Sequence, residues 1–136
     1  MSPSDTFEEV ATLVRKTLAL PDGEAITPPQ LFFYDLGFTS LDLLDLLFRL
    51  EEHFQIEIPE GTIYHLARGE LEESEFAEDA VLTEEGRRQF MTLLYDTPPQ
   101  LFPARIHAAT LPRYCTVGAI VRLVDHKLAE RERCSS

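Results

Sequence analysis

One serine in the sequence stands where its hydroxyl could carry a covalent group. Ser40 is the first residue of a leucine-rich run of helical length. The tetrapeptide TSLD predicts the start of a helix, with Thr39 as its cap and the side chain of Asp42 reaching back to the cap residue. A first-turn serine projects from the positive end of the helix dipole, where free backbone N–H groups favour a phosphate ester on the hydroxyl. The alternative is that Ser40 is an ordinary first-turn residue, and the tetrapeptide alone favours that interpretation.

Neither catalysis nor metal binding is indicated around this serine. The sequence lacks a GxSxG motif, and its 4 histidines lie outside any recognisable catalytic motif. No DxDxDG calcium loop occurs, and the spacing of Cys115 and Cys134 fits neither a metal site nor a disulfide framework. We therefore expect a protein that is not an enzyme and binds no metal, with both cysteines reduced.

The element that must position Ser40 is a predicted helix over residues 40–54. It ends within QIEIP, because the residue before Pro59 is biased away from helical angles. At 100° per residue, one side of this helix is continuously apolar, which predicts contact with a core. That core side holds Leu43, Leu46, Leu47, Leu50 and Phe54.

The opposite side of the same helix mixes apolar and acidic residues. It holds Leu41, Asp45, Phe48 and Glu52, with Leu44 at its edge. This mixture is typical of a docking strip for a partner that has apolar pockets and basic rims. Alternatively, an added segment of the chain covers Leu44 and Phe48, and Asp45 pairs with Arg49 one turn later. The helical wheel does not separate these alternatives.

Further helix signals are separated by proline-rich or acidic segments. Residues 5–18 carry apolar residues at three- and four-residue steps, which predicts a helix, and residues 20–38 are predicted to form a loop held by the cluster LFFY. Thr83 and Thr116 are predicted to cap two later helices. A short helix that Gly69 ends is followed by the acidic segment ELEESEFAEDAVL, which we expect to be solvated.

Composition limits the class of protein. The 136 residues are 44% hydrophobic and suit one compact domain, or one small domain that carries an insertion. The formal net charge of −12 disfavours nucleic acid and anionic membranes as partners. A partner with a basic patch is expected instead. No apolar run approaches a membrane span, and the first residues lack the pattern of a signal peptide. We expect a soluble, cytoplasmic monomer.

The segment FFYDLGFTSLDLLDLLFRLEEHFQIEIP resembles the acyl carrier protein family almost throughout. The family pattern is a phenylalanine-bearing loop, Asp-Leu-Gly, Ser-Leu-Asp, an acidic amphipathic helix and a hydrophobic run ending in Ile-Pro. The resemblance implies that Ser40 carries covalent 4′-phosphopantetheine, installed from coenzyme A by a phosphopantetheinyl transferase. It also implies that the terminal thiol of this arm holds an acyl chain as a thioester.

The resemblance also implies a fold and a partner surface. The fold would be all-α, a four-helix bundle made by residues 1–60 and about 104–130 of a single domain (residues 1–136), with a partly helical insertion at about 61–103. The third helix would be short, because PARIHAATLP offers only about one turn between prolines. Partner enzymes that load or process acyl groups would present basic patches to one side of the acidic helix. Its contacts would be Leu41, Asp42, Leu44, Asp45, Phe48, Glu51 and Glu52.

Departures from the family pattern leave alternatives open. The aspartate that usually precedes the serine is Thr39, which can still cap the helix but removes a charge from the attachment site. Peptidyl carriers place glycine and histidine before the serine, so an acyl or polyketide cargo, as in fatty acid or specialised lipid synthesis, is favoured over an amino acid or peptide. The rival is an unmodified carrier-like docking module. The insertion is expected either to widen the apolar region available to an acyl chain or, by slight preference, to add surface for one partner.

Overall fold

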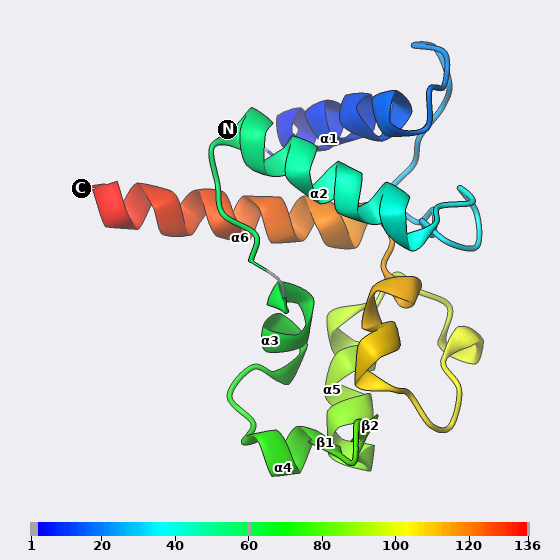
Figure 1. The fold of residues 1–136 in the computed structure, drawn as a ribbon, viewed down its shortest axis with the longest axis vertical. Helices are drawn as coiled ribbons and strands as arrows, with labels where there is room; N and C mark the ends of the chain where they lie inside the picture. The colour runs from blue at the N-terminus through cyan, green and yellow to red at the C-terminus, as the bar shows by residue number, and fades with distance from the viewer. Residues whose placement is uncertain (1–2, 60, 136) are drawn as a thin grey trace.

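The computed structural model describes residues 3–59 and 61–135, and its regular secondary structure is mostly helical (Figure 1). The all-α fold class is therefore confirmed. The elements in chain order are α1 (Pro3–Thr17), α2 (Ser40–Phe54), α3 (Thr62–Arg68), α4 (Glu73–Phe76), β1 (Ala77–Glu78), β2 (Val81–Leu82), α5 (Glu84–Leu93), the 3₁₀ helices η1 (Pro99–Leu101) and η2 (Ala108–Tyr114), and α6 (Val117–Ser135).

Three of these helices, α1, α2 and α6, form one layer, which we call the upper layer (Figure 1). Helix α1 packs against both α2 and α6. The core between them is filled by fully buried residues from each helix: Val10, Val14, Leu46, Leu50, Ile120 and Val124. A hydrogen bond from the buried Thr6 hydroxyl to the Asp125 carboxylate, 2.8 Å long, also joins α1 to α6.

The predicted bounds of α2 are confirmed, and the structure adds how the helix ends. Gln55 takes the left-handed conformation at φ 56°, and its N–H donates to the Glu51 carbonyl. Arg131 of α6 donates a further hydrogen bond to the Phe54 carbonyl. The end of α2 is therefore satisfied by a left-handed cap and an arginine, before Pro59 is reached.

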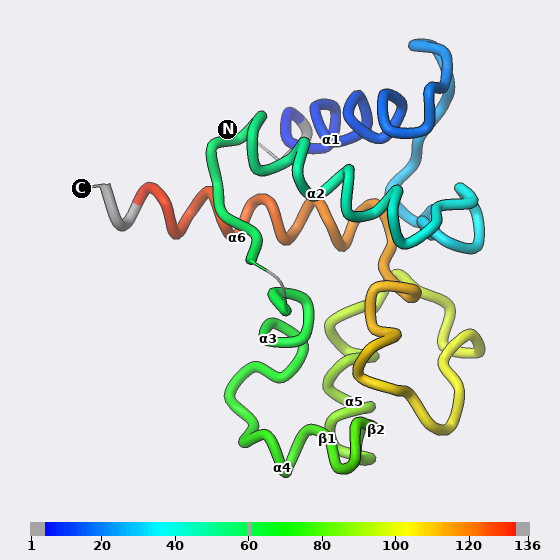
Figure 2. Tube along the Cα trace, viewed as in Figure 1, coloured from blue at the N-terminus to red at the C-terminus, as the bar shows by residue number. Residues whose placement is uncertain are grey.

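The remaining elements, α3 to η2, form a second group beside α6, which we call the lower layer; Figure 2 traces the chain through it. Helix α5 packs against α3 and α4. Thr83 caps α5 as predicted, because its hydroxyl accepts a hydrogen bond from the Gly86 N–H at 3.0 Å. Phe76 and Phe90 are fully buried in this layer.

The acidic side chains of the segment after Gly69 are exposed, as predicted, but the segment also folds and packs, which the sequence pattern did not indicate. This segment forms α4 and the β1–β2 hairpin, and Phe76 at the end of α4 is fully buried. The Phe76 ring meets the Tyr64 ring edge-on, with 5.2 Å between the centroids. One buried aromatic among many exposed acids leaves no periodic signal, which explains why the sequence pattern did not indicate the burial of Phe76.

The segment expected to supply a one-turn third helix forms η2. It is a 3₁₀ helix that contains Pro112, and it packs against α3 in the lower layer. Its residues Leu111 and Tyr114 are buried.

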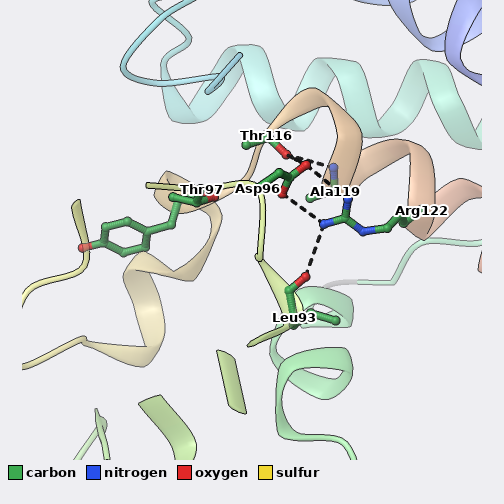
Figure 3. A network of polar contacts seen from close by, with 7 residues as sticks. Leu93, Asp96, Thr97, Thr116, Ala119 and Arg122 are labelled. Atoms are coloured by element: carbon green, nitrogen blue, oxygen red, sulfur yellow. Dashed lines mark hydrogen bonds and ion pairs between the residues drawn. The ribbon is translucent and has the colours of Figure 1, made fainter. Parts of the chain in front are cut away.

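A polar network joins the lower layer to the start of α6 (Figure 3). Asp96, just after α5, accepts hydrogen bonds from the Thr116 hydroxyl at 2.9 Å and from the Arg122 guanidinium. Thr116 caps α6 as predicted, with its hydroxyl accepting from the Ala119 N–H at 3.0 Å. Arg122 also donates to the Leu93 carbonyl. The network fixes the end of α5 against the first turns of α6.

Candidate functional site

The predicted capping of the Ser40 helix is confirmed in detail. The Thr39 hydroxyl accepts from the Asp42 N–H at 3.2 Å, and the Asp42 carboxylate accepts from the Thr39 N–H at 2.9 Å. Ser40 is the first residue of α2 and is exposed. Among the described residues, its hydroxyl has no hydrogen-bond partner. A serine left free at a helix start, where backbone N–H groups lack intrahelical partners, can accept a phosphate ester without losing a native contact.

The loop before Ser40 is held against the upper-layer core. Phe38 and Phe32 are buried with their ring centroids 4.9 Å apart, and the Phe38 N–H donates to the Phe32 carbonyl at 2.9 Å. The Leu31 N–H donates to the Asp35 carboxylate at 2.8 Å, which closes the turn. The predicted anchoring of this loop by its aromatics is thus confirmed. It places Ser40 at a fixed position while leaving its hydroxyl in solvent.

The apolar residues predicted for the docking side of α2 are exposed. Leu41 is 78%, Leu44 49% and Phe48 59% exposed. The alternative that another segment covers Leu44 and Phe48 is therefore wrong for the part of the chain that the structure describes. We refer to Leu41, Leu44, Asp45, Phe48 and Glu52 as the α2 docking face.

The acidic residues of α2 are largely engaged within the protein. Asp45 pairs with Arg49 at 3.3 Å, as one alternative predicted, and Asp42 serves the capping box. Glu51 accepts a hydrogen bond from the Ile58 N–H at 2.8 Å, a role that no sequence pattern indicated. Glu52 is exposed. Asp42 and Glu51 therefore support the local fold, and the exposed apolar side chains dominate the α2 docking face.

Other titratable residues give no sign of a second chemical site. His53 pairs with Glu9 at 3.0 Å and His126 with Glu130 at 2.9 Å, both at the surface. Burial raises the pKa of the Cys115 thiol to about 12, so this thiol stays protonated and unreactive at neutral pH. The side chain of Cys134 lies outside the described residues. Within those residues, no group of three metal-ligating side chains could hold an ion, and no helix is long and apolar enough to cross a membrane.

Sequence comparison finds a family model and several proteins that are similar to this chain. The family model described as "Phosphopantetheine attachment site" matches residues 8–68, which include Ser40. The acyl carrier protein of Helicobacter hepaticus is 43% identical over 56 residues, which are 41% of this chain and 72% of that relative. The chain belongs to the acyl carrier protein family. This acyl carrier protein is also 40% identical over 63 residues to "Acyl carrier protein 3, chloroplastic" of Hordeum vulgare, covering 46% of this chain and 47% of that relative.

A third relative is "Acyl carrier protein AcpXL" of Brucella melitensis, which is 41% identical to this chain over 56 residues. These residues cover 41% of this chain and 59% of that relative. The chain spans about half the length of the chloroplastic relatives it matches, at 47% and 57%. The family match ends at residue 68, the last residue of α3. The family match therefore covers α1 from Glu8 onward, α2 and α3, while α4, α5 and α6 lie outside it.

Acyl carrier proteins carry 4′-phosphopantetheine covalently and are carriers, not enzymes. The residues of this chain fit that group. Ser40 offers an exposed hydroxyl without a hydrogen-bond partner, beside the unpaired N–H groups of the first turn of α2. When bound, the arm supplies the thiol that forms a thioester with the acyl group.

Proposed function

We propose that this acyl carrier protein tethers acyl or polyketide intermediates as thioesters on a 4′-phosphopantetheine arm attached to Ser40. It would present them to enzymes of fatty acid, specialised lipid or polyketide synthesis in the cytoplasm. The observation that carries the proposal is the exposed, unbonded hydroxyl of Ser40 at the capped start of α2, inside the stretch that matches the phosphopantetheine attachment family. A phosphopantetheinyl transferase would install the arm from coenzyme A.

The residues around Ser40 would hold the attachment site in a fixed position. The Thr39–Asp42 capping box holds the first turn, so the phosphodiester would lie at the positive end of the α2 dipole. The buried Phe38 anchors the loop before Ser40 in the core. The tether then raises the effective concentration of the acyl group at a partner's active site, without requiring tight docking.

The α2 docking face is the surface we propose for partner enzymes. Leu41, Leu44 and Phe48 would enter apolar pockets, and Glu52 with Asp45 would meet the basic rim. The net charge of −12 would favour encounter with such basic surfaces. A docking face of a few exposed side chains suits the weak, exchangeable binding that a carrier needs.

We propose a single domain whose insertion begins after Arg68, somewhat later than the sequence pattern suggested. The family match through residue 68 supports assigning α3, and not η2, as the third helix of the carrier pattern. Helix α6 would then be the fourth helix, because it packs with α1 and α2 in the upper layer. Residues 69–115 would form the insertion between the third and fourth helices.

The test is intact-protein mass after co-expression with a broad-specificity phosphopantetheinyl transferase. We expect a gain of one phosphopantetheine that is lost in Ser40→Ala. Ser74→Ala, which removes another exposed serine at the start of a helix, is the matched control and should keep the gain. If folded protein gains no mass with several transferases, the carrier function is wrong and the unmodified docking module replaces it.

A further inference from the structure

The chain that leads into α6 lies between the lower layer and the loop before the attachment serine. We call residues 114–118 the junction segment; it joins η2 to the first turn of α6. Every residue of this segment is buried. Because buried backbone groups need hydrogen-bond partners, the elements that supply these partners are held in place relative to one another.

The start of α6 binds the loop that leads to the attachment serine. We call residues 27–39 the attachment loop. The Val117 N–H donates to the Gln30 carbonyl at 2.9 Å, and the Gly118 N–H donates to the Pro28 carbonyl at 2.8 Å. First-turn N–H groups have no partner inside their own helix, so the attachment loop satisfies the start of α6.

Two further contacts continue this pairing toward the attachment serine. The Phe32 N–H donates to the Cys115 carbonyl at 3.3 Å, and an isolated β-bridge pairs Leu31 with Thr116. The Phe38 N–H in turn donates to the Phe32 carbonyl at 2.9 Å. The position of the attachment loop is therefore set by the junction segment as well as by its own aromatic residues.

The lower layer holds the same junction segment through two residues that follow α5. The Asp96 carboxylate accepts hydrogen bonds from the Thr116 hydroxyl at 2.9 Å and from the Arg122 guanidinium at 3.1 Å (Figure 3). The buried Thr97 hydroxyl donates to the Tyr114 carbonyl at 2.7 Å. The junction segment is thus hydrogen-bonded both to the insertion and to the attachment loop.

Gly118 shows how closely the insertion and the attachment loop approach each other. A Cβ at this position would lie 2.7 Å from Oδ2 of Asp96 and 3.3 Å from the carbonyl oxygen of Pro28. Asp96 and the attachment loop therefore border the same small space beside α6. A change at Asp96 reaches the attachment loop through a single residue.

We propose that Asp96 is a positioning residue for the modification of Ser40, because it holds the attachment loop, through the junction segment, in the arrangement that a phosphopantetheinyl transferase binds. The proposal rests on the carrier function above and gives a role to residues beyond residue 68, where the family match ends. A partner's apparent affinity falls in proportion to the fraction of molecules in the binding-competent arrangement. Loss of Asp96 should therefore raise the KM of the transferase and leave its kcat nearly unchanged.

The competing explanation is that Asp96 adds stability but does not position the attachment loop. The buried Phe32 and Phe38 would then hold the loop by themselves. Residues 27–29 are exposed, which argues against this explanation. The beginning of the attachment loop lacks a buried side chain there and depends on its hydrogen bonds to α6.

Three variants provide the test. Asp96→Ala removes the contacts with the junction segment and α6, and Asp96→Asn keeps the shape of the side chain and tests the same contacts if the alanine variant does not fold. Gly86→Ala is the matched control, because its Cβ would overlap Phe76 elsewhere in the lower layer and should also lower stability. Two quantities are measured on folded protein: backbone order parameters from NMR relaxation, and transferase kinetics at Ser40.

We expect Asp96→Ala to lower the order parameters of residues 28–38 from the rigid value of about 0.85, and Gly86→Ala to leave them near it. The transferase KM should rise about threefold or more in Asp96→Ala, as it would if the competent fraction fell to about one third. Asp96→Asn should change both quantities in the same direction by a smaller amount, and Gly86→Ala should change neither.

Two results would overturn the proposal. One is an unchanged KM in folded Asp96 variants, and the other is an equal change in Gly86→Ala, which would assign the effect to lost stability. If the native protein is not modified at Ser40, the carrier function itself fails. The order parameters still decide in that case whether Asp96 positions the attachment loop.

Discussion

Arg122 holds Asp96 with two hydrogen bonds, 3.1 Å and 3.2 Å long, from its two terminal guanidinium nitrogens to the two carboxylate oxygens. This paired geometry is the strong form of an arginine–carboxylate contact. Arg122 belongs to α6 and Asp96 follows α5, so the contact joins the two layers of the protein (Figure 3). The guanidinium carbon also lies 4.4 Å from the centre of the Tyr95 ring.

Asp96→Ala should lower the free energy of unfolding by about 2 kcal/mol, because hydrogen bonds to charged groups in partly buried sites have that magnitude. Only 18% of the Asp96 side chain is exposed. The matched control is Asp45→Ala, which breaks an ion pair whose side chains are 40% and 50% exposed and should cost less than about 1 kcal/mol. Urea denaturation measures both. Equal effects would mean that the Arg122 contact does not stabilise the junction.

Gly86→Ala should be strongly destabilising, although alanine normally favours a helix over glycine. A Cβ at Gly86 would overlap the backbone carbonyl of Phe76, which packs against the start of α5. We expect a loss of about 2 kcal/mol or more, measured by thermal unfolding. Gly23→Ala is the control, since a Cβ there meets nothing within 4 Å, and it should change stability by less than about 1 kcal/mol. An unaffected Gly86→Ala would contradict this packing of α4 on α5.

Thr39→Ala should cost about 1 kcal/mol of stability, because it removes the oxygen that accepts from the Asp42 N–H. Thr39→Asp keeps a capping oxygen and should leave the melting temperature near that of the native protein. It also restores the acid that the family pattern places before the serine. We therefore expect the Thr39→Asp protein to be modified faster by a phosphopantetheinyl transferase. A slower rate would show that this chain uses threonine for recognition.

Phe48→Ala should change function without changing stability. Phe48 is 59% exposed, whereas Leu46, two residues earlier on the core side, is fully buried. We expect Leu46→Ala to cost about 2–5 kcal/mol and Phe48→Ala less than about 0.5 kcal/mol. Phe48→Ala should raise the KM of the transferase for this carrier about fivefold or more.

The control for Phe48→Ala is Tyr95→Ala, which removes another exposed aromatic, on the lower layer. It should leave that KM unchanged. An equal rise in both variants would assign the effect to general surface hydrophobicity and remove the α2 docking face from the proposal.

Stability should fall at high pH through Cys115. Its pKa is raised from 9.0 to about 12 in the folded protein because the thiol is buried. The unfolded chain releases this proton at lower pH than the folded protein, so the thiol's contribution is complete below about pH 9 and is lost as pH rises toward 12. Urea denaturation at pH 7.5 and 10.5 should show a larger loss for the native protein than for Cys115→Ala. Equal losses would mean that the thiol is accessible.

The helices around Ser40 could be predicted from the sequence because their signals are local. The core side of α2 repeats at the helical period, Thr39 and Asp42 are three residues apart, and Thr83 and Thr116 each precede a helix that they cap. Such contacts form between residues close in the chain, so the pattern of types is enough to specify them. The exposed Ser40 follows from the same local geometry.

What only the tertiary structure decided depends on contacts between distant residues. The sequence could not tell whether Phe48 was covered, because that depends on where the lower layer packs. It gave no sign that Glu51 would accept from the Ile58 N–H, or that Phe76 would be buried beside Tyr64. Local periodicity determined the helix that carries Ser40. The cleft lined by residues of α3, α5 and α6 was decided only by the packing of the lower layer against α6. Its side chains are far apart in the sequence and meet only when the chain has folded.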